Sequence, residues 1–298
     1  MKSLVTGGAG FIGSHIVDKL LNMGHEVVVI DNQCSNSREE YYWNDKSKNY
    51  KLDICNYQGT RSLYDNVDYV FHAAAEASIV SAIENPLETM RTNSMGTCTV
   101  LQCAYEARVR KVIYSSTSAA YGMNNSPNIE TQLNDCLNPY SVSKVAGEEL
   151  CKMYTTLYSL PTIIFRYFNV YGERAPSKGQ YAPVTSIFMK QKEYGESLTI
   201  VGDGNQRRDF VYVGDIVSAN IMAALGNLSF EEYGQVYNVG TGTNYSVNQI
   251  ARMISDDTIN IPPRPGEVRV SLANVNKIKK TLGWQPKMKL EDWIGAHL

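Results

Sequence analysis

The sequence predicts an α/β fold, a doubly wound parallel sheet with a smaller C-terminal lobe. Three observations carry this prediction. Short β-rich runs alternate with helical patterns through about the first 170 residues, a glycine array joins the first strand to the first helix, and the character of the chain changes after Gly172. Alternating strands and helices are typical of parallel sheets that helices cover on both faces.

Five runs are predicted to be strands because each is brief, rich in Val, Ile and aromatic residues, and almost continuously hydrophobic. Strands that are buried on both faces have this composition. The five runs are residues 3–6, 27–31, 67–72, 111–115 and 162–167. Helical patterns lie between them at residues 11–23, 86–107 and 140–160. We therefore assign residues 1–171 to one doubly wound domain.

Residues 172–298 are predicted to form the smaller lobe. Their first part is loop-like at 174–181 and helical at 184–194, and Pro- and Gly-rich stretches follow at 202–205 and 261–266. Segments 210–213 and 236–239 have the composition of core strands, so one or both could return to the main sheet. The last residues, 295–298, are predicted to be a slightly truncated final helix or an added tail.

The overall charge excludes several classes of partner. The 298 residues carry 28 Lys and Arg against 30 Asp and Glu, a net charge of −2. This balance argues against a broad electrostatic surface for nucleic acid or membranes. The six cysteines contain no Cys-x-x-Cys pair and the four histidines lie far apart, so neither disulfides nor a metal site is expected. We expect a cytoplasmic globular protein.

The glycine array is the first motif with chemical meaning. Gly7, Gly10 and Gly13 lie between the first strand and the first helix, where Phe11 and Ile12 begin the helix. Glycine is required where the chain turns sharply and its backbone approaches a pyrophosphate that a Cβ would obstruct. The helix N-terminus then offers free N–H groups and partial positive charge to the phosphates.

An acidic residue at the end of the second strand completes a dinucleotide-binding (Rossmann) motif. Asp31 follows Gly13 by eighteen residues, and its carboxylate could accept both ribose hydroxyls while repelling a 2′-phosphate. The motif therefore predicts NAD, with Asn32 beside it at the cofactor. Asp53 and Ile54, after a third candidate strand, could hold the adenine; the alternative is an ordinary loop Asp and a core Ile.

A Tyr-x-x-x-Lys pair is the second motif. Four residues on a helix place Tyr140 and Lys144 on one face, where the ammonium would lower the pKa of the phenol, as would the positive nicotinamide of bound NAD. The tyrosine could then act as a general base. The same spacing occurs at Tyr42 and Lys46, but that pair lies in a polar, loop-like stretch and is predicted to be structural.

A hydroxyl-rich exit from the fourth of the five predicted strands supports the choice of Tyr140. The run Tyr114-Ser-Ser-Thr-Ser-Ala-Ala-Tyr-Gly122 precedes Tyr140. It places Thr117 and Ser118 at the carboxyl ends of the strands, where open α/β sheets bind ligands. We predict Thr117, Tyr140 and Lys144 as the catalytic residues; the alternative for the last two is an ordinary surface pair.

Together these residues resemble the extended short-chain dehydrogenase/reductase family, in particular its branch of NAD-dependent sugar-nucleotide epimerases and dehydratases. The resemblance covers essentially the whole chain and is greatest to UDP-glucose and UDP-N-acetylglucosamine 4-epimerases. Beyond the motifs above, it rests on five further runs: Phe71-His-Ala-Ala-Ala75, Asn93-Ser-Met-Gly-Thr97, Arg166-Tyr-Phe-Asn-Val-Tyr-Gly172, Arg208-Asp-Phe-Val-Tyr-Val213 and Arg264-Pro-Gly-Glu-Val-Arg269.

The resemblance implies roles on the cofactor side of the site. Ala73, Ala74 and Ala75 would line the cofactor, Lys144 would hold its ribose, and Asn93 would pack beneath the active site. The alternatives for these residues are an ordinary strand end and a helix-capping Asn.

Other residues are implied to hold the substrate. Asn169 would contact its pyrophosphate, and Arg208 and Arg264 would clamp the diphosphate, for which guanidinium groups are suited because they pair with it bidentately. Arg207 and Arg269 are expected to be solvated surface residues.

The resemblance also narrows the reaction. Dehydratases of the family place Asp-Glu after the catalytic Thr, whereas Thr117 is followed by Ser118 and Ala119, which cannot act as that acid/base pair. Uronic-acid enzymes tend to carry Thr in place of Asn169 and an Arg seven residues later, where this chain has Pro176. Redox-neutral 4-epimerisation of a UDP-hexose remains, with Ser118 among the substrate contacts.

One position bears on the choice of sugar. In related epimerases the residue seven positions after the Arg264 equivalent is a gate, where a bulky Tyr excludes N-acetyl groups. Here it is Ser271, which favours UDP-GlcNAc and UDP-GalNAc as well as or instead of UDP-Glc and UDP-Gal; the alternative is a serine with no gating role. Glu267 replaces an Asp that faces the uridine ribose in the family. A substrate with a nucleobase other than uracil is therefore kept as an alternative.

Two alternative functions remain at this point. One is another nucleotide-sugar epimerase or oxidoreductase, acting on UDP-glucuronate or on a GDP- or dTDP-sugar. The other is a non-catalytic NAD-binding regulator, which the intact catalytic set argues against.

The resemblance further implies a homodimer. The helical stretches 86–107 and 140–160 carry more apolar residues than one sheet face requires, and such a pair builds a four-helix interface in the family.

Overall fold

The computed structural model describes residues 1–35, 40–177, 182–263 and 268–298. Its centre is a seven-stranded sheet in the order β10-β6-β5-β4-β1-β2-β3, in which every neighbouring pair is parallel. The predicted α/β fold with a doubly wound parallel sheet is confirmed. The seven strands are β1 (Lys2–Thr6), β2 (Glu26–Asp31), β3 (Lys48–Lys51), β4 (Tyr69–His72), β5 (Lys111–Thr117), β6 (Thr162–Tyr167) and β10 (Gln235–Val239).

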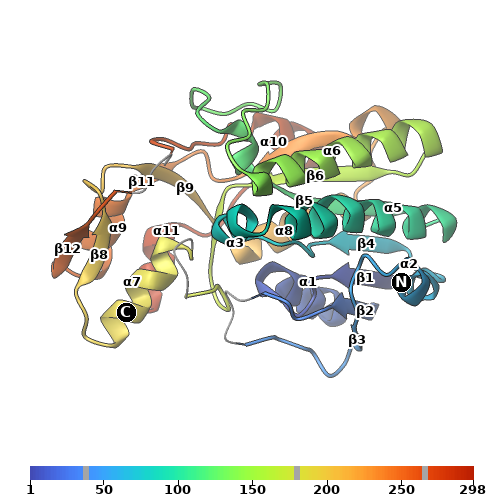
Figure 1. Ribbon diagram of the computed structural model, residues 1–298, viewed down its shortest axis with the longest axis horizontal. Coiled ribbons are helices and arrows are strands. Elements are labelled where there is room, and N and C mark those ends of the chain that lie inside the picture. The colour runs from blue at the N-terminus through green and yellow to red at the C-terminus, as the bar shows by residue number, and fades with distance from the viewer. Residues whose placement is uncertain (36–39, 178–181, 264–267) are drawn as a thin grey trace.

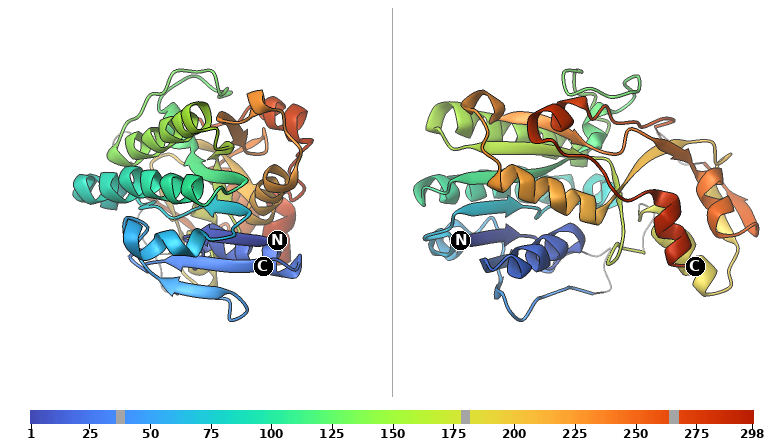
Figure 2. Two further views of the ribbon diagram at one scale, coloured as in Figure 1. Left: turned by 90° about the vertical axis from the view of Figure 1, so that its right-hand side faces the viewer. Right: turned by 180° about the vertical axis from the view of Figure 1, so that it is seen from behind.

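Helices cover both faces of this sheet (Figures 1 and 2). Residues of α5 and α6 build one hydrophobic core with the inner strands, and residues of α1 and α8 build a second core on the opposite face. The strands are therefore apolar on both sides, which explains their continuous hydrophobicity. The helices of this part are α1 (Phe11–Asn22), α2 (Tyr57–Thr60), α3 (Ile79–Glu84), α4 (Pro86–Met90), α5 (Gly96–Glu106), α6 (Pro139–Tyr158), α8 (Val213–Leu225) and α10 (Asn276–Leu282).

The predicted helix at residues 86–107 is divided in two. A π-helical turn at Arg91–Met95 separates α4 from α5. A π-helical turn widens the helix locally and is frequent at functional sites. It lies beside the cofactor groove described below, to which Thr92 contributes.

The smaller lobe lies at the left of Figure 1. It contains a three-stranded sheet in the order β11-β9-β7, a two-stranded sheet of β12 and β8, and a core of its own. Its elements are β7 (Asn169–Tyr171), α7 (Val184–Glu193), β8 (Leu198–Val201), β9 (Arg207–Tyr212), β11 (Asn244–Ser246), α9 (Val247–Ile254), β12 (Thr258–Ile261) and α11 (Leu290–Ala296).

The chain after residue 172 does not stay in this lobe. Of the two candidate core strands, 236–239 falls in β10, which pairs with β6 as the seventh strand of the main sheet. The other, 210–213, falls mainly in β9 and pairs with β7 in the lobe, where the first half of β9 pairs with β11. Because α8 and β10 bury their apolar residues on the main sheet, the two parts are interleaved in sequence and the lobe is not one continuous segment.

No described helix is both long enough and apolar enough to cross a membrane.

Candidate active site

The glycine array turns the chain from β1 into α1 at the carboxyl end of the sheet. Gly7 has φ +68°, and a Cβ there would lie 2.7 Å from the Ala74 nitrogen. A Cβ on Gly13 would lie 2.1 Å from the Gly7 carbonyl oxygen. Only glycine fits these two positions, because real side chains do not approach backbone so closely. Gly10 is the N-cap of α1, and Phe11, Ile12 and Gly13 form its first turn.

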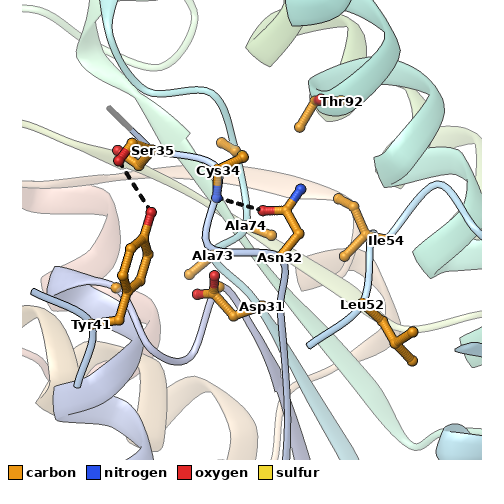
Figure 3. Close-up of a pocket in the computed structure, with 13 residues that line it drawn as sticks. Asp31, Asn32, Cys34, Ser35, Tyr41, Leu52, Ile54, Ala73, Ala74 and Thr92 are labelled. Carbon is orange, nitrogen blue, oxygen red and sulfur yellow. Dashed lines mark hydrogen bonds between the residues drawn. The ribbon is translucent and has the colours of Figure 1, made fainter. Parts of the chain in front are cut away.

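Asp31 ends β2 next to this turn and is 8% exposed. Its carboxylate accepts hydrogen bonds from the backbone N–H groups of Ala9, at 3.1 Å, and Gln33, at 2.8 Å. These bonds fix the carboxylate against the glycine turn and place it in a groove (Figure 3).

The groove has an open volume of about 520 Å³, part of which is open to solvent. Eight residues of the predicted cofactor set line it: Gly7, Gly10, Asp31, Asn32, Ile54, Ala73, Ala74 and Ala75. Figure 3 shows Asp31 between Tyr41 on one side and Leu52 and Ile54 on the other. A Cβ-free turn, a fixed carboxylate and flanking apolar side chains fit an adenine dinucleotide.

The groove also contains residues that sequence reasoning missed. These are Cys34, Ser35, Tyr41, Leu52 and Thr92. Leu52 had a signal, since it is two residues from Ile54 after the same strand and alternate residues share a face. Tyr41 had none, because it comes from an irregular loop whose Tyr42 N–H bonds the Ala9 carbonyl at 2.9 Å.

Asp53 is not among the groove residues. Its carboxylate accepts hydrogen bonds from Arg91 Nη2 at 2.8 Å and from the Cys55 N–H at 2.8 Å. The structure therefore places Ile54 in the groove and gives the Asp53 side chain an ion pair with the π-helical turn.

The predicted catalytic residues meet at the carboxyl ends of β5 and β6. Thr117 ends β5 and is 8% exposed, and Tyr140 and Lys144 lie in the first turns of α6. Asn138 caps this helix by accepting the Ser141 N–H at 2.9 Å. Burial raises the pKa of Tyr140, and its hydrogen bond with the Thr117 hydroxyl opposes that rise. Thr117 and Tyr140 are thus close enough to act on one substrate oxygen.

Lys144 is almost fully buried, at 3% exposure. Its ammonium nitrogen lies 4.4 Å from the centre of the Tyr114 ring. Burial lowers the pKa of Lys144 to about 8, and the nearby Cys151 and Glu148 oppose this effect. Within the described residues, no carboxylate forms an ion pair with Lys144, so its N–H groups are available to a bound ligand.

Beneath the site, Asn93 holds two segments together. Its amide oxygen accepts the Glu76 N–H at 2.8 Å, and its amide nitrogen donates to the Glu76 carbonyl and to Ser143 Oγ, both at 2.9 Å. It therefore connects the chain after the alanine run of 73–75 to the residue before Lys144.

His72 lies in a second buried network. Its Nδ1 is 2.7 Å from Thr6 Oγ1 and its Nε2 is 2.9 Å from Thr97 Oγ1. Burial, together with the positive charge of Lys144, lowers the pKa of His72 to about 3, so the ring is neutral at physiological pH.

Comparison with known proteins decides the family. The model of the NAD dependent epimerase/dehydratase family matches residues 3–240. The chain belongs to the NAD-dependent epimerase/dehydratase family. NAD is therefore the cofactor of this chain.

Three similar proteins show the range of this family. A UDP-glucose 4-epimerase structure from Thermotoga maritima is 36% identical, with a TM-score of 0.92 over 99% of this chain and 96% of the other. A UDP-N-acetylglucosamine 4-epimerase structure from Methanobrevibacter ruminantium is 34% identical, with a TM-score of 0.91 over 98% and 95%. A UDP-glucuronate 4-epimerase from Thermodesulfobacterium geofontis is 33% identical over 98% of this chain and 93% of its own length.

The residues predicted to hold the substrate lie in both parts of the fold. Ser118 follows Thr117 in a 3₁₀ turn. Asn169, in β7, donates from its amide to the Asp209 carbonyl at 3.0 Å. Arg208, in the neighbouring β9, is half-buried and donates to the Arg207 carbonyl at 3.0 Å. Ser271 is half-buried, and its N–H bonds the Arg207 carbonyl at 3.0 Å. The lobe thus brings Asn169, Arg208 and Ser271 to one small sheet.

Two of the predicted substrate residues, Arg264 and Glu267, lie outside the described residues. Of the two arginines predicted to be solvated, Arg269 is exposed and forms a bidentate ion pair with Asp203 at 2.7 and 2.8 Å. Arg207 is half-buried instead, because it binds the side chain and the carbonyl of Asn244 at 2.8 and 2.7 Å.

A second pocket lies in the lobe between α7, β8 and α9, with an open volume of about 460 Å³. Most of its lining is apolar: Ala182, Val184, Ile187, Phe188, Thr199, Val201, Gln206, Val247 and Ile261. The sequence analysis did not find it, because its residues come from four separate elements.

The Tyr42–Lys46 pair has no helix to align it. Residues 40–44 are irregular, and the Tyr42 ring lies 5.2 Å from the Arg174 guanidinium carbon. Tyr42 therefore packs between the glycine turn at Ala9 and the chain that follows β7.

Proposed function

We propose that the protein catalyses redox-neutral 4-epimerisation of a UDP-hexose through a 4-keto intermediate, with NAD tightly bound. The observation that carries the proposal is the grouping of Thr117, Tyr140 and Lys144 beside the cofactor groove. The similarity to 4-epimerases over nearly the whole chain supports it. Ser118 and Ala119 after Thr117 argue against a dehydratase, since neither side chain is an acid or a base.

Tyr140 is the base in this mechanism. Its phenolate takes the proton of the sugar 4-hydroxyl, while Thr117 donates a hydrogen bond to the same oxygen. NAD⁺, held in the groove at Asp31 and Ile54, would supply reversible acceptance of the hydride from the sugar C4. Burial raises the Tyr140 pKa in the protein alone, although Lys144 lies one helical turn away, so the positive charge of a bound nicotinamide would be needed to bring it toward neutrality.

Binding energy in such an enzyme should be concentrated on the nucleotide. The sugar has to turn over between the two steps, so tight contacts to it would slow the reaction. We assign the diphosphate to Arg208 and Asn169, together with Arg264 and with Glu267 at the ribose. The apolar pocket lined by Val184, Phe188 and Val201 suits a planar base, because it lies in the same lobe and Gln206 on its edge is two residues from Arg208.

We propose that the sugar is an N-acetylhexosamine as well as or instead of glucose or galactose, because Ser271 leaves room at the gating position. The test is incubation with UDP-GlcNAc, UDP-GalNAc, UDP-glucose and UDP-galactose, followed by NMR of the sugar. Interconversion without net NADH supports the proposal. Accumulation of NADH supports a net oxidoreductase instead, and no turnover of any nucleotide sugar contradicts both.

We also propose a cytoplasmic homodimer that pairs α4–α5 and α6 of each subunit. Apolar side chains stand exposed on these helices, including Leu87 at 87%, Met95 at 62% and Leu157 at 67%, and such patches mark protein interfaces. All six cysteines are free thiols, as in a reducing compartment. Size-exclusion chromatography with light scattering should give twice the mass of the chain; the monomer mass would contradict the dimer.

A further inference from the structure

A buried ion pair lies directly behind the catalytic residues. Glu148, in α6, is 0% exposed and Arg166, in β6, is 2% exposed. Arg166 Nε donates to Glu148 Oε1 at 2.8 Å, and Arg166 Nη2 donates to Glu148 Oε2 at 2.6 Å. Such a bidentate pair fixes the relative position of the two chains that carry it.

The carboxylate of this pair also holds the strand that carries Thr117. Ser116 Oγ donates to Glu148 Oε1 at 2.5 Å, and Ser116 is the residue before Thr117 and the register partner of Arg166. Glu148 follows Lys144 by one helical turn on the same face of α6. One carboxylate therefore joins β5, β6 and α6 at the end of the sheet where the proposed chemistry takes place.

The guanidinium of the pair reaches the segments on the other side of Thr117. Its central carbon lies 4.6 Å from the centre of the Tyr121 ring, in the 3₁₀ turn after Thr117, and Nη2 also donates to Asn134 Oδ1 at 2.6 Å. Arg166 Nη1 is buried without a hydrogen-bond partner among the described residues. An unsatisfied buried donor costs free energy, so this arrangement is not the most stable one available to the pair.

We propose that Glu148 and Arg166 are positioning residues, which hold α6 against the end of β5 so that the Tyr140 phenol stays at the Thr117 hydroxyl. Removing two charges from water is costly, and an apolar pair of the same volume is often no less stable. The specific geometry that the pair imposes is therefore its contribution. The negative charge of Glu148 also favours the protonated form of Lys144, against the burial that lowers the Lys144 pKa. This inference rests on the proposed 4-epimerase reaction.

Three variants test the proposal at increasing severity. Ser116→Ala removes only the bond from β5 to Glu148 and leaves the ion pair in place. Arg166→Lys keeps the charge but loses the planar fork. Glu148→Gln removes the charge, and if it fails to fold the first two still decide. We expect Ser116→Ala and Arg166→Lys to lower kcat about ten-fold with the KM for the nucleotide sugar and the content of NAD unchanged, since misplaced reacting groups slow the chemical step without weakening binding.

Thr155→Val is the matched control. Thr155 is also buried in α6, at 3% exposure. The substitution removes its hydrogen bonds to the Leu160 carbonyl, at 2.9 Å, and to Thr162 Oγ1, at 2.7 Å. It lies far along the helix from Tyr140. We expect this variant to lower the Tm while kcat stays within about two-fold of the wild type.

A second measurement does not depend on turnover. The ionisation of Tyr140 in the holoenzyme can be followed by phenolate absorbance, as the difference between each protein and the same protein carrying Tyr140→Phe. We expect the Tyr140 midpoint to rise in Ser116→Ala, because the Thr117 hydroxyl then stabilises the phenolate less.

The outcomes separate the two proposals. An unchanged kcat in Ser116→Ala and Arg166→Lys, or an unchanged Tyr140 midpoint in Ser116→Ala, overturns the positioning role. If the wild type interconverts none of the nucleotide sugars, the proposed function is wrong, and the Tyr140 midpoint still decides whether the ion pair positions the phenol.

Discussion

Asp31→Asn tests the origin of the NAD preference. The substitution keeps the size of the side chain and removes its charge. In the structure the carboxylate accepts the Ala9 and Gln33 N–H groups at 3.1 and 2.8 Å, and the amide oxygen of Asn can keep one of these bonds. The variant is therefore expected to fold. Its main loss should be the hydrogen bonds that the Asp31 carboxylate is expected to accept from the ribose hydroxyls of NAD.

The size of that loss follows from the hydrogen bonds involved. Bonds to a charged group contribute about 1.5–3 kcal/mol, and each 1.4 kcal/mol corresponds to about a ten-fold change in affinity. NAD should therefore bind roughly ten- to a hundred-fold more weakly to Asp31→Asn. NADP should lose less, because the same change removes a repulsion against its 2′-phosphate.

The assay is calorimetric titration of NAD and NADP into protein stripped of cofactor. Asp68→Asn is the matched control. Asp68 accepts the Lys2 N–H at 2.9 Å and pairs with Arg110 Nε at 3.1 Å, but it precedes β4, at the amino end of the sheet. That variant should bind NAD as the wild type does. Equal losses of NAD affinity in the two variants, or an unchanged NAD-to-NADP ratio in Asp31→Asn, would refute the reasoning.

Two further predictions concern the catalytic end of the sheet. Tyr140→Phe should abolish turnover while NAD stays bound, measured by NMR of the sugar and by the cofactor content after purification; surviving activity would show that another group is the base. His72 should make the protein acid-sensitive: its pKa is about 3 when folded against about 6.5 when unfolded, so the unfolded state binds the extra proton between these values. As the pH drops below 6.5, the free energy of unfolding of the wild type should decrease more steeply than that of His72→Gln, by up to about 1.4 kcal/mol per pH unit. Urea unfolding between pH 7 and 4 measures both slopes, and equal slopes in the two proteins would contradict this prediction.

The parts of the fold that the sequence predicts are those whose signal is local. The inner strands β1, β2, β4, β5 and β6 are apolar because helices cover both of their faces, and the glycine turn is required by the close approach of Gly7 and Gly13 to backbone. Edge strand β3 lacks that signal. All four of its residues, 48–51, are exposed and polar or aromatic, so only its place before Asp53, and not its composition, marks it as a candidate strand.

The features that escaped prediction depend on contacts between distant segments. Thr92 reaches the cofactor groove because a π-helical turn interrupts the helix, and Asp53 turns away because Arg91 in that turn binds it. The Ser116–Glu148–Arg166 group joins three elements, and no spacing along the chain reveals it. The placement of β10 in the main sheet and of β9 in the lobe is likewise decided by which neighbour each strand pairs with.

The proposed path of the hydrogen at C4 is the claim that most needs testing. The direct measurement uses a UDP-hexose carrying deuterium at C4, incubated with the holoenzyme without added NAD in ordinary water. The proposed mechanism predicts the 4-epimer with its deuterium retained at C4 and no accumulation of reduced cofactor, because the label leaves and returns within one site. Loss of the deuterium to solvent would show that C4 is deprotonated instead and would contradict the role of NAD in the reaction.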